Sequence, residues 1–83
     1  PEGGPRSTGQ YTHDVAVTAR VREALIRAPG LRSNTIQVET YRGTVQLSGF
    51  ADDEDSAANA IAAARQVPGV NEVRNNIQVR KPQ

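Results

Sequence analysis

The sequence predicts an α+β fold: a two-layer α/β sandwich in α-β-β-α-β order, with two helices on one face of a three-stranded mixed sheet. Three observations predict this class. Two segments carry apolar residues at helical spacing, three segments alternate apolar with polar residues, and a Pro-Gly pair follows each helical segment. A sheet that is apolar on one face needs both helices on that face, so its other face is expected to be polar and open.

Size and composition allow one small domain. The chain has 83 residues, of which 36% are hydrophobic and only 4% aromatic, so the core is expected to be thin and aliphatic. It contains no cysteine and one histidine, which excludes disulfides, thiol catalysis and zinc clusters. A net charge of +1 does not by itself indicate nucleic-acid binding. No apolar run approaches the ~18 residues of a membrane span.

The ends of the chain differ in composition from its middle. Residues 1–11 are rich in Gly, Pro and small polar residues and are predicted to be a flexible linker, followed by a domain over 12–80 and a tail over 81–83. Because the chain starts with neither Met nor an apolar segment, any export signal or lipid anchor is expected upstream.

The first helix is predicted to begin near Thr12, with Thr12 or His13 and Asp14 at its start. Pro29-Gly30 ends it. Its buried face is spaced at i, i+4, i+7, i+8 and i+11, and comprises Val17, Val21, Ala24, Leu25 and Ala28.

A β-hairpin is predicted next. Residues 36–41 and 44–49 alternate apolar with polar positions around the two-residue turn Arg42-Gly43. Arg is less favoured than Asn at the first turn position, whereas Gly43 supplies the second position, which needs positive φ. Gly49, near the end of the second strand, is assigned to close packing.

The second helix and the last strand complete the domain. Residues 52–55 are all acidic and are expected to cap the second helix, which Pro68-Gly69 stops, with Gly69 as the stop position. Asn75 shares the inward alternation of the last strand, so it is predicted to be hydrogen-bonded to backbone beneath a helix. The buried residues are expected to be Ala57, Ala60, Ile61, Ala64 and Val67 of the helix, and Val73, Ile77 and Val79 of the strand.

From Asp14 to Val79 the chain resembles the BON domain family (bacterial OsmY and nodulation domain). Four motifs carry the resemblance: the spacing of Asp14, Val17, Thr18, Val21, Ala24 and Leu25; Pro29-Gly30-Leu31; Gly43-x-Val45-x-Leu47-Ser48-Gly49; and Val67-Pro68-Gly69-Val70 before Val73-x-Asn75-x-Ile77. The resemblance implies an exported, non-enzymatic module of Gram-negative envelopes, found in lipoproteins and osmotic-stress proteins, which attaches to phospholipid or to envelope partners. It brings no catalytic residue and no cofactor, and it implies a second BON domain in the parent chain as one arrangement.

A second apolar stripe marks the first helix. Advancing about 100° per residue places Val15, Ala19 and Ile26 opposite the buried face, with Arg22 beside them. An apolar strip next to an arginine can insert between lipid headgroups or dock a protein, while isolated surface aliphatics are the simpler interpretation. Arg20 and Arg27, with Glu23 between them, are interpreted as a network of charged side-chain pairs on the helix surface.

Other chemistries find little support in the sequence. Tyr41, Phe50, Arg74 and Arg80 on the open sheet face resemble a nucleic-acid platform, but the two rings are expected ~20 Å apart, and no Gly-x-x-Gly loop occurs. The acidic run 52–55 lacks the alternating spacing of a calcium loop, so no metal site is assigned. His13 has no second histidine or nucleophile motif beside it and is expected to be solvated, so no catalytic residue is assigned.

The leading hypothesis is therefore a non-enzymatic module that attaches to anionic phospholipid surfaces through Val15, Ala19, Arg22 and Ile26. The alternative is a protein-interaction domain that binds an envelope protein or a second copy through the same strip or an open sheet edge. A periplasmic location is expected from the resemblance, with outer-membrane association through an upstream anchor as a further alternative. No nucleic-acid partner is expected.

Overall fold

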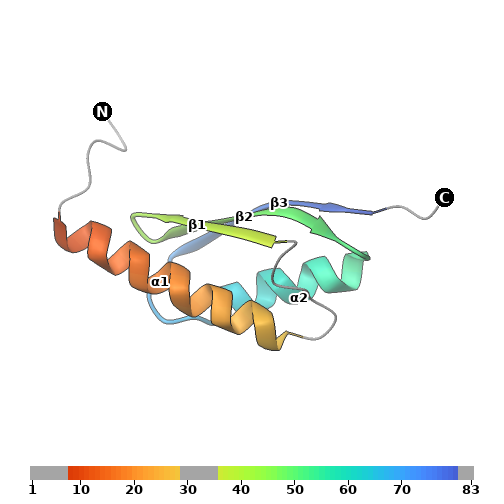
Figure 1. Ribbon diagram of the computed structural model, residues 1–83, viewed down its shortest axis with the longest axis horizontal. Coiled ribbons are helices and arrows are strands. Elements are labelled where there is room, and N and C mark those ends of the chain that lie inside the picture. Colours follow the sequence, from red (N-terminus) through yellow and green to blue (C-terminus); the bar gives the residue numbers. More distant parts are fainter. Residues whose placement is uncertain (1–7, 29–35, 81–83) are drawn as a thin grey trace.

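The computed structural model describes residues 8–28 and 36–80, and its elements follow the predicted order (Figure 1). They are α1 (Thr8–Arg27), β1 (Ile36–Tyr41), β2 (Thr44–Ala51), α2 (Glu54–Arg65) and β3 (Glu72–Val79). The strand order is β1-β2-β3, in which β1 pairs antiparallel and β3 pairs parallel with β2. The predicted α+β class and mixed sheet are confirmed.

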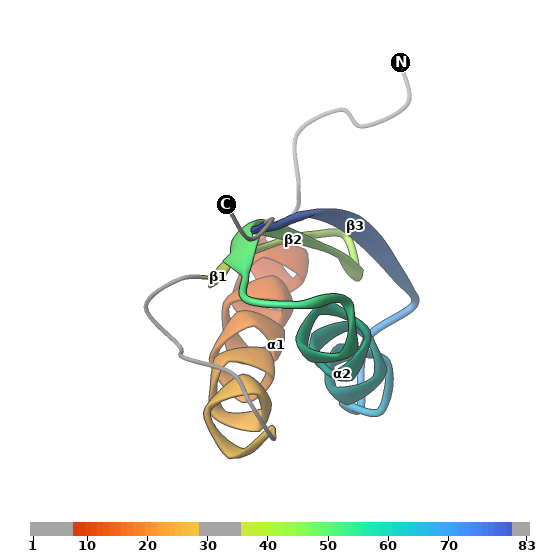
Figure 2. The ribbon, with the colours of Figure 1, turned by 90° about the vertical axis from the view of Figure 1, so that its right-hand side faces the viewer.

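Both helices lie on one face of the sheet. Figure 2 shows α1 beneath the β1 side and α2 beneath the β3 side, in agreement with the contacts between these pairs of elements. The opposite face of the sheet has no covering element among the described residues. One flank of α1 therefore contacts α2, while its other flank lies along the outer edge of the sheet.

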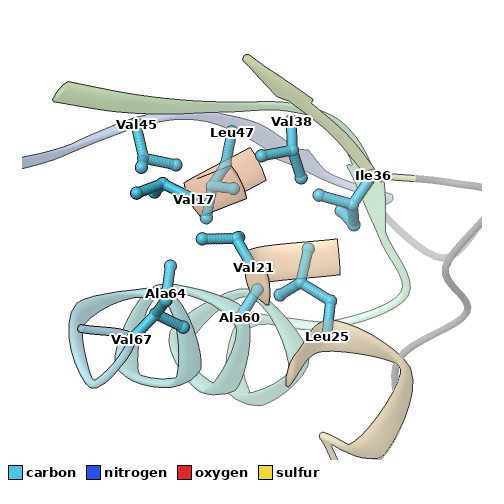
Figure 3. Close-up of a cluster of buried hydrophobic side chains, with 10 residues drawn as sticks. All are labelled: Val17, Val21, Leu25, Ile36, Val38, Val45, Leu47, Ala60, Ala64 and Val67. Atoms are coloured by element: carbon cyan, nitrogen blue, oxygen red, sulfur yellow. The ribbon is translucent and has the colours of Figure 1, made fainter. Parts of the chain in front are cut away.

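The core fills the space between the layers. Three large side chains of α1 point toward the sheet, whereas α2 contributes mainly alanines, whose small side chains let this helix lie close to its neighbours (Figure 3). Burying each valine or leucine is worth about 1.5–3 kcal/mol. The buried cluster comprises Val17, Val21, Leu25, Ile36, Val38, Val45, Leu47, Ala60, Ala64 and Val67.

Helix α1 begins earlier than the composition indicated. It starts at Thr8, so that residues 8–11, assigned to the linker, are helical. Two side-chain hydrogen bonds support this extension, and each spans one helical turn. Thr12 Oγ1 donates to the Thr8 carbonyl at 3.0 Å, and Gln10 Nε2 donates to Asp14 Oδ1 at 3.2 Å. The remaining linker residues, the tail and the predicted Pro29-Gly30 helix stop lie outside the described residues.

Asp14 does not start the helix. It lies within α1, is 1% exposed, and accepts hydrogen bonds from the backbone N–H groups of both residues of the hairpin turn, Arg42 at 2.7 Å and Gly43 at 3.0 Å. Both turn residues have positive φ, 54° and 85°, as a type I′ turn requires. The hairpin register that the sequence predicts is confirmed, and Asp14 is its anchor on α1.

The acidic cap of α2 is confirmed at one residue. Asp53 is the N-cap, and its Oδ1 accepts a hydrogen bond from the Ser56 backbone N–H at 2.7 Å. This bond, followed by a side-chain bond with Ser56, lowers the pKa of Asp53 below its ordinary value of 3.8. The acidic residues therefore begin a helix, as their position in the sequence indicated.

The predicted burial of Asn75 beneath a helix is wrong. The residue is exposed, because β3 is an edge strand, and its Oδ1 accepts from the Ile77 backbone N–H two residues along the same strand at 2.9 Å. The amide thus occupies a backbone donor of an edge strand, which is one way of limiting edge-to-edge pairing. Its bond to backbone, though local, was correctly expected.

Two further glycines have positive φ, Gly49 at 118° and Gly69 at 97°. A Cβ at Gly69 would lie 2.9 Å from Val17 Cγ2 and 3.2 Å from the His13 ring, so the loop after α2 needs glycine to approach α1. His13 is exposed, as expected, but its ring also packs over this loop.

Candidate functional site

The exposed flank of α1 carries most of the large apolar side chains outside the core. Five such side chains are exposed among the described residues, and three belong to α1: Tyr11 at 54%, Val15 at 51% and Ile26 at 62%. With Ala19 and Arg22 they are spaced at i, i+4, i+8, i+11 and i+15, which is one side of a helix. We call Tyr11, Val15, Ala19, Arg22 and Ile26 the α1 strip.

The α1 strip borders a groove along the outer edge of β1. The groove has a volume of about 910 Å³ and is formed where α1 passes under β1, with the Thr18 Oγ1 to Thr40 Oγ1 hydrogen bond of 2.7 Å joining the two elements. We call this hollow the β1 groove. Its lining includes Tyr11, Val15, Ala19 and Arg22 of α1, Glu39, Thr40 and Tyr41 of β1, Arg42 of the turn, and Gln46 and Arg74 of the outer sheet face.

The arrangement predicted for the strip is thus present: the four residues proposed as contacts, Val15, Ala19, Arg22 and Ile26, are all exposed on one flank of α1. Three of them, Val15, Ala19 and Arg22, also line the β1 groove, whereas Ile26 lies beyond it. Their role as contacts remains a prediction.

The pair network on α1 does not form. Arg20, Glu23 and Arg27 line a smaller hollow of about 340 Å³ between α1 and α2, yet none of them makes an ion pair with another described residue. Arg74 Nε and Glu72 Oε2 form an ion pair at 3.7 Å on the open surface, where such pairs contribute little.

The polar sheet face does not form a stacking platform. Tyr41 lies opposite Thr44 at the turn, whereas Phe50 lies six residues further along β2, and the separation expected from the register is confirmed. Phe50 instead contacts the Arg80 guanidinium, 5.9 Å from its ring centroid. No two exposed aromatic rings of the described residues adjoin on this face.

Among residues 8–28 and 36–80, no group of three His, Asp or Glu side chains is placed to hold a metal ion. No helix in these ranges is sufficiently long and apolar to cross a bilayer.

Two residues of this region were missed by sequence reasoning. Tyr11 was assigned to the linker, although it precedes Val15 by one helical turn, and that spacing was the available signal. Arg42 was treated only as an imperfect turn residue. No sequence pattern indicates that it lines a groove with α1, because that depends on the bond between Asp14 and the turn.

Comparison with known proteins identifies the family of the chain. The sequence model of the BON domain family matches residues 13–81, which is most of the chain. The chain belongs to the BON domain family. This BON domain is 36% identical over 72 residues to the osmotically-inducible protein Y of Escherichia coli K12, an alignment covering 87% of this chain and 36% of that protein.

A second relative is the outer membrane lipoprotein DolP of Haemophilus influenzae, which is 32% identical over 76 residues, covering 90% of this chain and 39% of the relative. The BON domain thus spans little more than a third of the length of these two curated relatives. The family resemblance drawn from the sequence motifs is confirmed.

Proposed function

We propose that this BON domain is a non-enzymatic module of a bacterial envelope protein and that it attaches to anionic phospholipid surfaces through the α1 strip. The observation that carries the proposal is the exposure of Val15 and Ile26 on the flank of α1 that contains Arg22. The names of the two relatives, one osmotically inducible and one an outer membrane lipoprotein, support a periplasmic location with outer-membrane association.

The chemistry of the strip suits shallow attachment. Val15 and Ile26 offer a few methylene groups, each worth about 0.8 kcal/mol when buried in the acyl boundary, and each basic residue near an anionic surface adds about 1 kcal/mol. Tyr11 places an amphipathic ring at the N-terminal end of the strip, and such rings favour the headgroup level. The expected affinity is weak, so stable attachment would depend on an anchor or on a second module.

The alternative is that the strip docks a protein. The observation favouring it is the β1 groove, because a hollow flanked by exposed Tyr11 and Tyr41 also suits a protein side chain. Ionic strength separates the two functions, because headgroup attraction weakens with salt whereas apolar docking persists.

The test is co-sedimentation of the chain with phosphatidylglycerol-containing vesicles and with phosphatidylcholine vesicles, at low and high salt. We expect salt-sensitive binding to the anionic vesicles alone and a loss of about tenfold or more in Val15→Ser plus Ile26→Ser, because two apolar contacts are removed. A matched control is Ala58→Ser plus Ala62→Ser on the exposed face of α2, which should bind like the native chain. A folded native chain that stays in the supernatant throughout would refute attachment to phospholipid.

A further inference from the structure

Strand β3 leaves one edge of the sheet unpaired. It pairs with β2 along one side, and no strand lies on its other side in the part of the chain that the structure describes. The Arg80 N–H donates to the Ala51 carbonyl of β2 at 2.9 Å. Because backbone groups alternate in direction along a strand, the even-numbered residues of β3 bond to β2 and the odd-numbered ones direct their N–H and carbonyl groups to the free edge.

The apolar side chains along this free edge are only half covered. Val73 and Ile77 pack against the core but stay partly exposed, whereas Val45 and Leu47 of the neighbouring strand are fully buried. A further strand beside β3 would cover this side of the core and pair with the outward backbone groups.

The sequence of β3 is complementary to itself in the antiparallel direction. A second β3 centred on Asn76 places Glu72 opposite Arg80 of that copy, and two-fold symmetry forms this pair twice. In the same register the odd-numbered residues face one another, so outward N–H groups meet outward carbonyl groups. Registers two residues away instead place Arg74 opposite Arg80, or Glu72 opposite Gln78, and lose the opposite-charge pair.

We propose that the free edge of β3 pairs with the same edge of a second copy of this chain, antiparallel and centred on Asn76. The two three-stranded sheets then form one continuous sheet, with the helices of both copies on the same face. This edge is separate from the α1 strip, so the association needs no lipid.

Asn75 keeps the association weak. Its Oδ1 accepts the Ile77 N–H at 2.9 Å, so this local bond opens before a carbonyl of the second copy takes the same donor. The strand is also only eight residues long, whereas a standard interface uses about 20–30 residues a side. A short edge with one occupied donor suits a reversible contact between copies rather than a permanent dimer.

Disulfide trapping tests the register, because the chain contains no cysteine of its own. In Asn76→Cys the two thiols face each other across the symmetry axis, where Cα atoms of a non-hydrogen-bonded pair are about 4.5 Å apart, within the range of disulfides. The matched control is Gln78→Cys on the same exposed face, whose two copies would lie four residues apart along the strands, about 13 Å.

We expect Asn76→Cys to form a disulfide-linked dimer about tenfold faster than Gln78→Cys under mild oxidation without lipid, because only its thiols are held within bonding distance. Both cysteines replace exposed residues, so the comparison is made on folded chains, which circular dichroism checks.

Two further changes, each in the Asn76→Cys background, test the side chains. Glu72→Lys should slow cross-linking about fivefold, because it places like charges opposite each other, and adding Arg80→Glu should restore the rate. Asn75→Val should accelerate cross-linking about fivefold, because it frees the Ile77 N–H and adds a β-branched side chain to the strand.

Equal cross-linking rates for Asn76→Cys and Gln78→Cys would overturn the proposed pairing, and so would a rate that Glu72→Lys leaves unchanged. Faster cross-linking of Gln78→Cys would exclude the register centred on Asn76. Because no vesicle is present, these outcomes are independent of whether the α1 strip attaches to phospholipid.

Discussion

The two helices lie on the same face of the sheet but differ in what they expose. Helix α1 buries one side and exposes Tyr11, Val15 and Ile26 on another, whereas the exposed positions of α2 are alanine or charged, such as Ala58, Ala62 and Arg65. Core packing explains the buried sides of both helices equally well. It does not explain why the large exposed apolar side chains of the helical layer belong to α1, and this difference is the basis for proposing that helix as the contact surface.

The helices also use their carboxyl groups differently. Asp14 of α1 bonds to a turn 28 and 29 residues away in the sequence, so it joins two elements of the domain. Asp53 bonds to Ser56, three residues away, so it stabilises the first turn of its own helix. The contrast shows that the carboxyl group inside α1 is part of the tertiary structure, whereas the one that caps α2 is purely local.

The largest effect is expected for Asp14→Ala. It removes the acceptor of two backbone N–H groups in a buried setting and leaves Arg42 in a strained conformation without its support. We expect the free energy of unfolding to fall by about 3 kcal/mol, since an unsatisfied buried donor costs about 1–3 kcal/mol. Urea denaturation measures it, and Asp14→Ala combined with Arg42→Asn should recover part of the loss by relieving the turn.

A loss below about 1 kcal/mol in Asp14→Ala would contradict the account, because it would mean that the turn is equally stable without its anchor. The same measurement on Asp55→Ala, an exposed acid in the first turn of α2, gives the baseline for removing a carboxyl group.

A smaller effect is expected for Asp53→Ala, because its hydrogen bond is local and the Asp53 side chain is itself exposed. The lowered pKa of Asp53 means that its stabilising contribution is fully present above 3.8, the ordinary value, and is lost as the pH falls through the lower pKa of the folded state. Native and Asp53→Ala chains should therefore differ in melting temperature near neutral pH and converge in strong acid.

The control is Asp53→Asn, because asparagine also caps helices; its melting temperature near neutral pH should be close to that of the native chain. A difference in melting temperature between native and Asp53→Ala that persists unchanged in acid would exclude the carboxylate as its cause.

Much of the fold could be predicted from the sequence because its signals are local. Strict alternation over 36–41 and 44–49 around a two-residue turn determines the hairpin register, and the acidic run before an alanine-rich segment determines the start of α2. Asn75 was misplaced because alternation gives the direction of a side chain but not whether a helix covers it at the edge of a sheet. The start of α1 was misplaced because its first turns are linked to Asp14, whose position depends on the distant hairpin.

The candidate site was only half predictable for the same reason. Helical spacing was sufficient to predict the exposed flank that carries Val15, Ala19, Arg22 and Ile26, whose role as contacts stays a prediction. The β1 groove and the position of Arg42 depend on how α1 crosses β1, which no local pattern in the sequence specifies.

The central claim, that α1 rather than α2 meets the membrane, is tested most directly by paramagnetic broadening of amide NMR signals from phosphatidylglycerol vesicles or bicelles that contain a nitroxide-labelled lipid. The account predicts strong broadening for the amides of Tyr11, Val15, Ala19 and Ile26, and native intensity for Ala58 and Ala62 on the exposed face of α2. Equal broadening on both helices, or broadening that is strongest on α2, would contradict it.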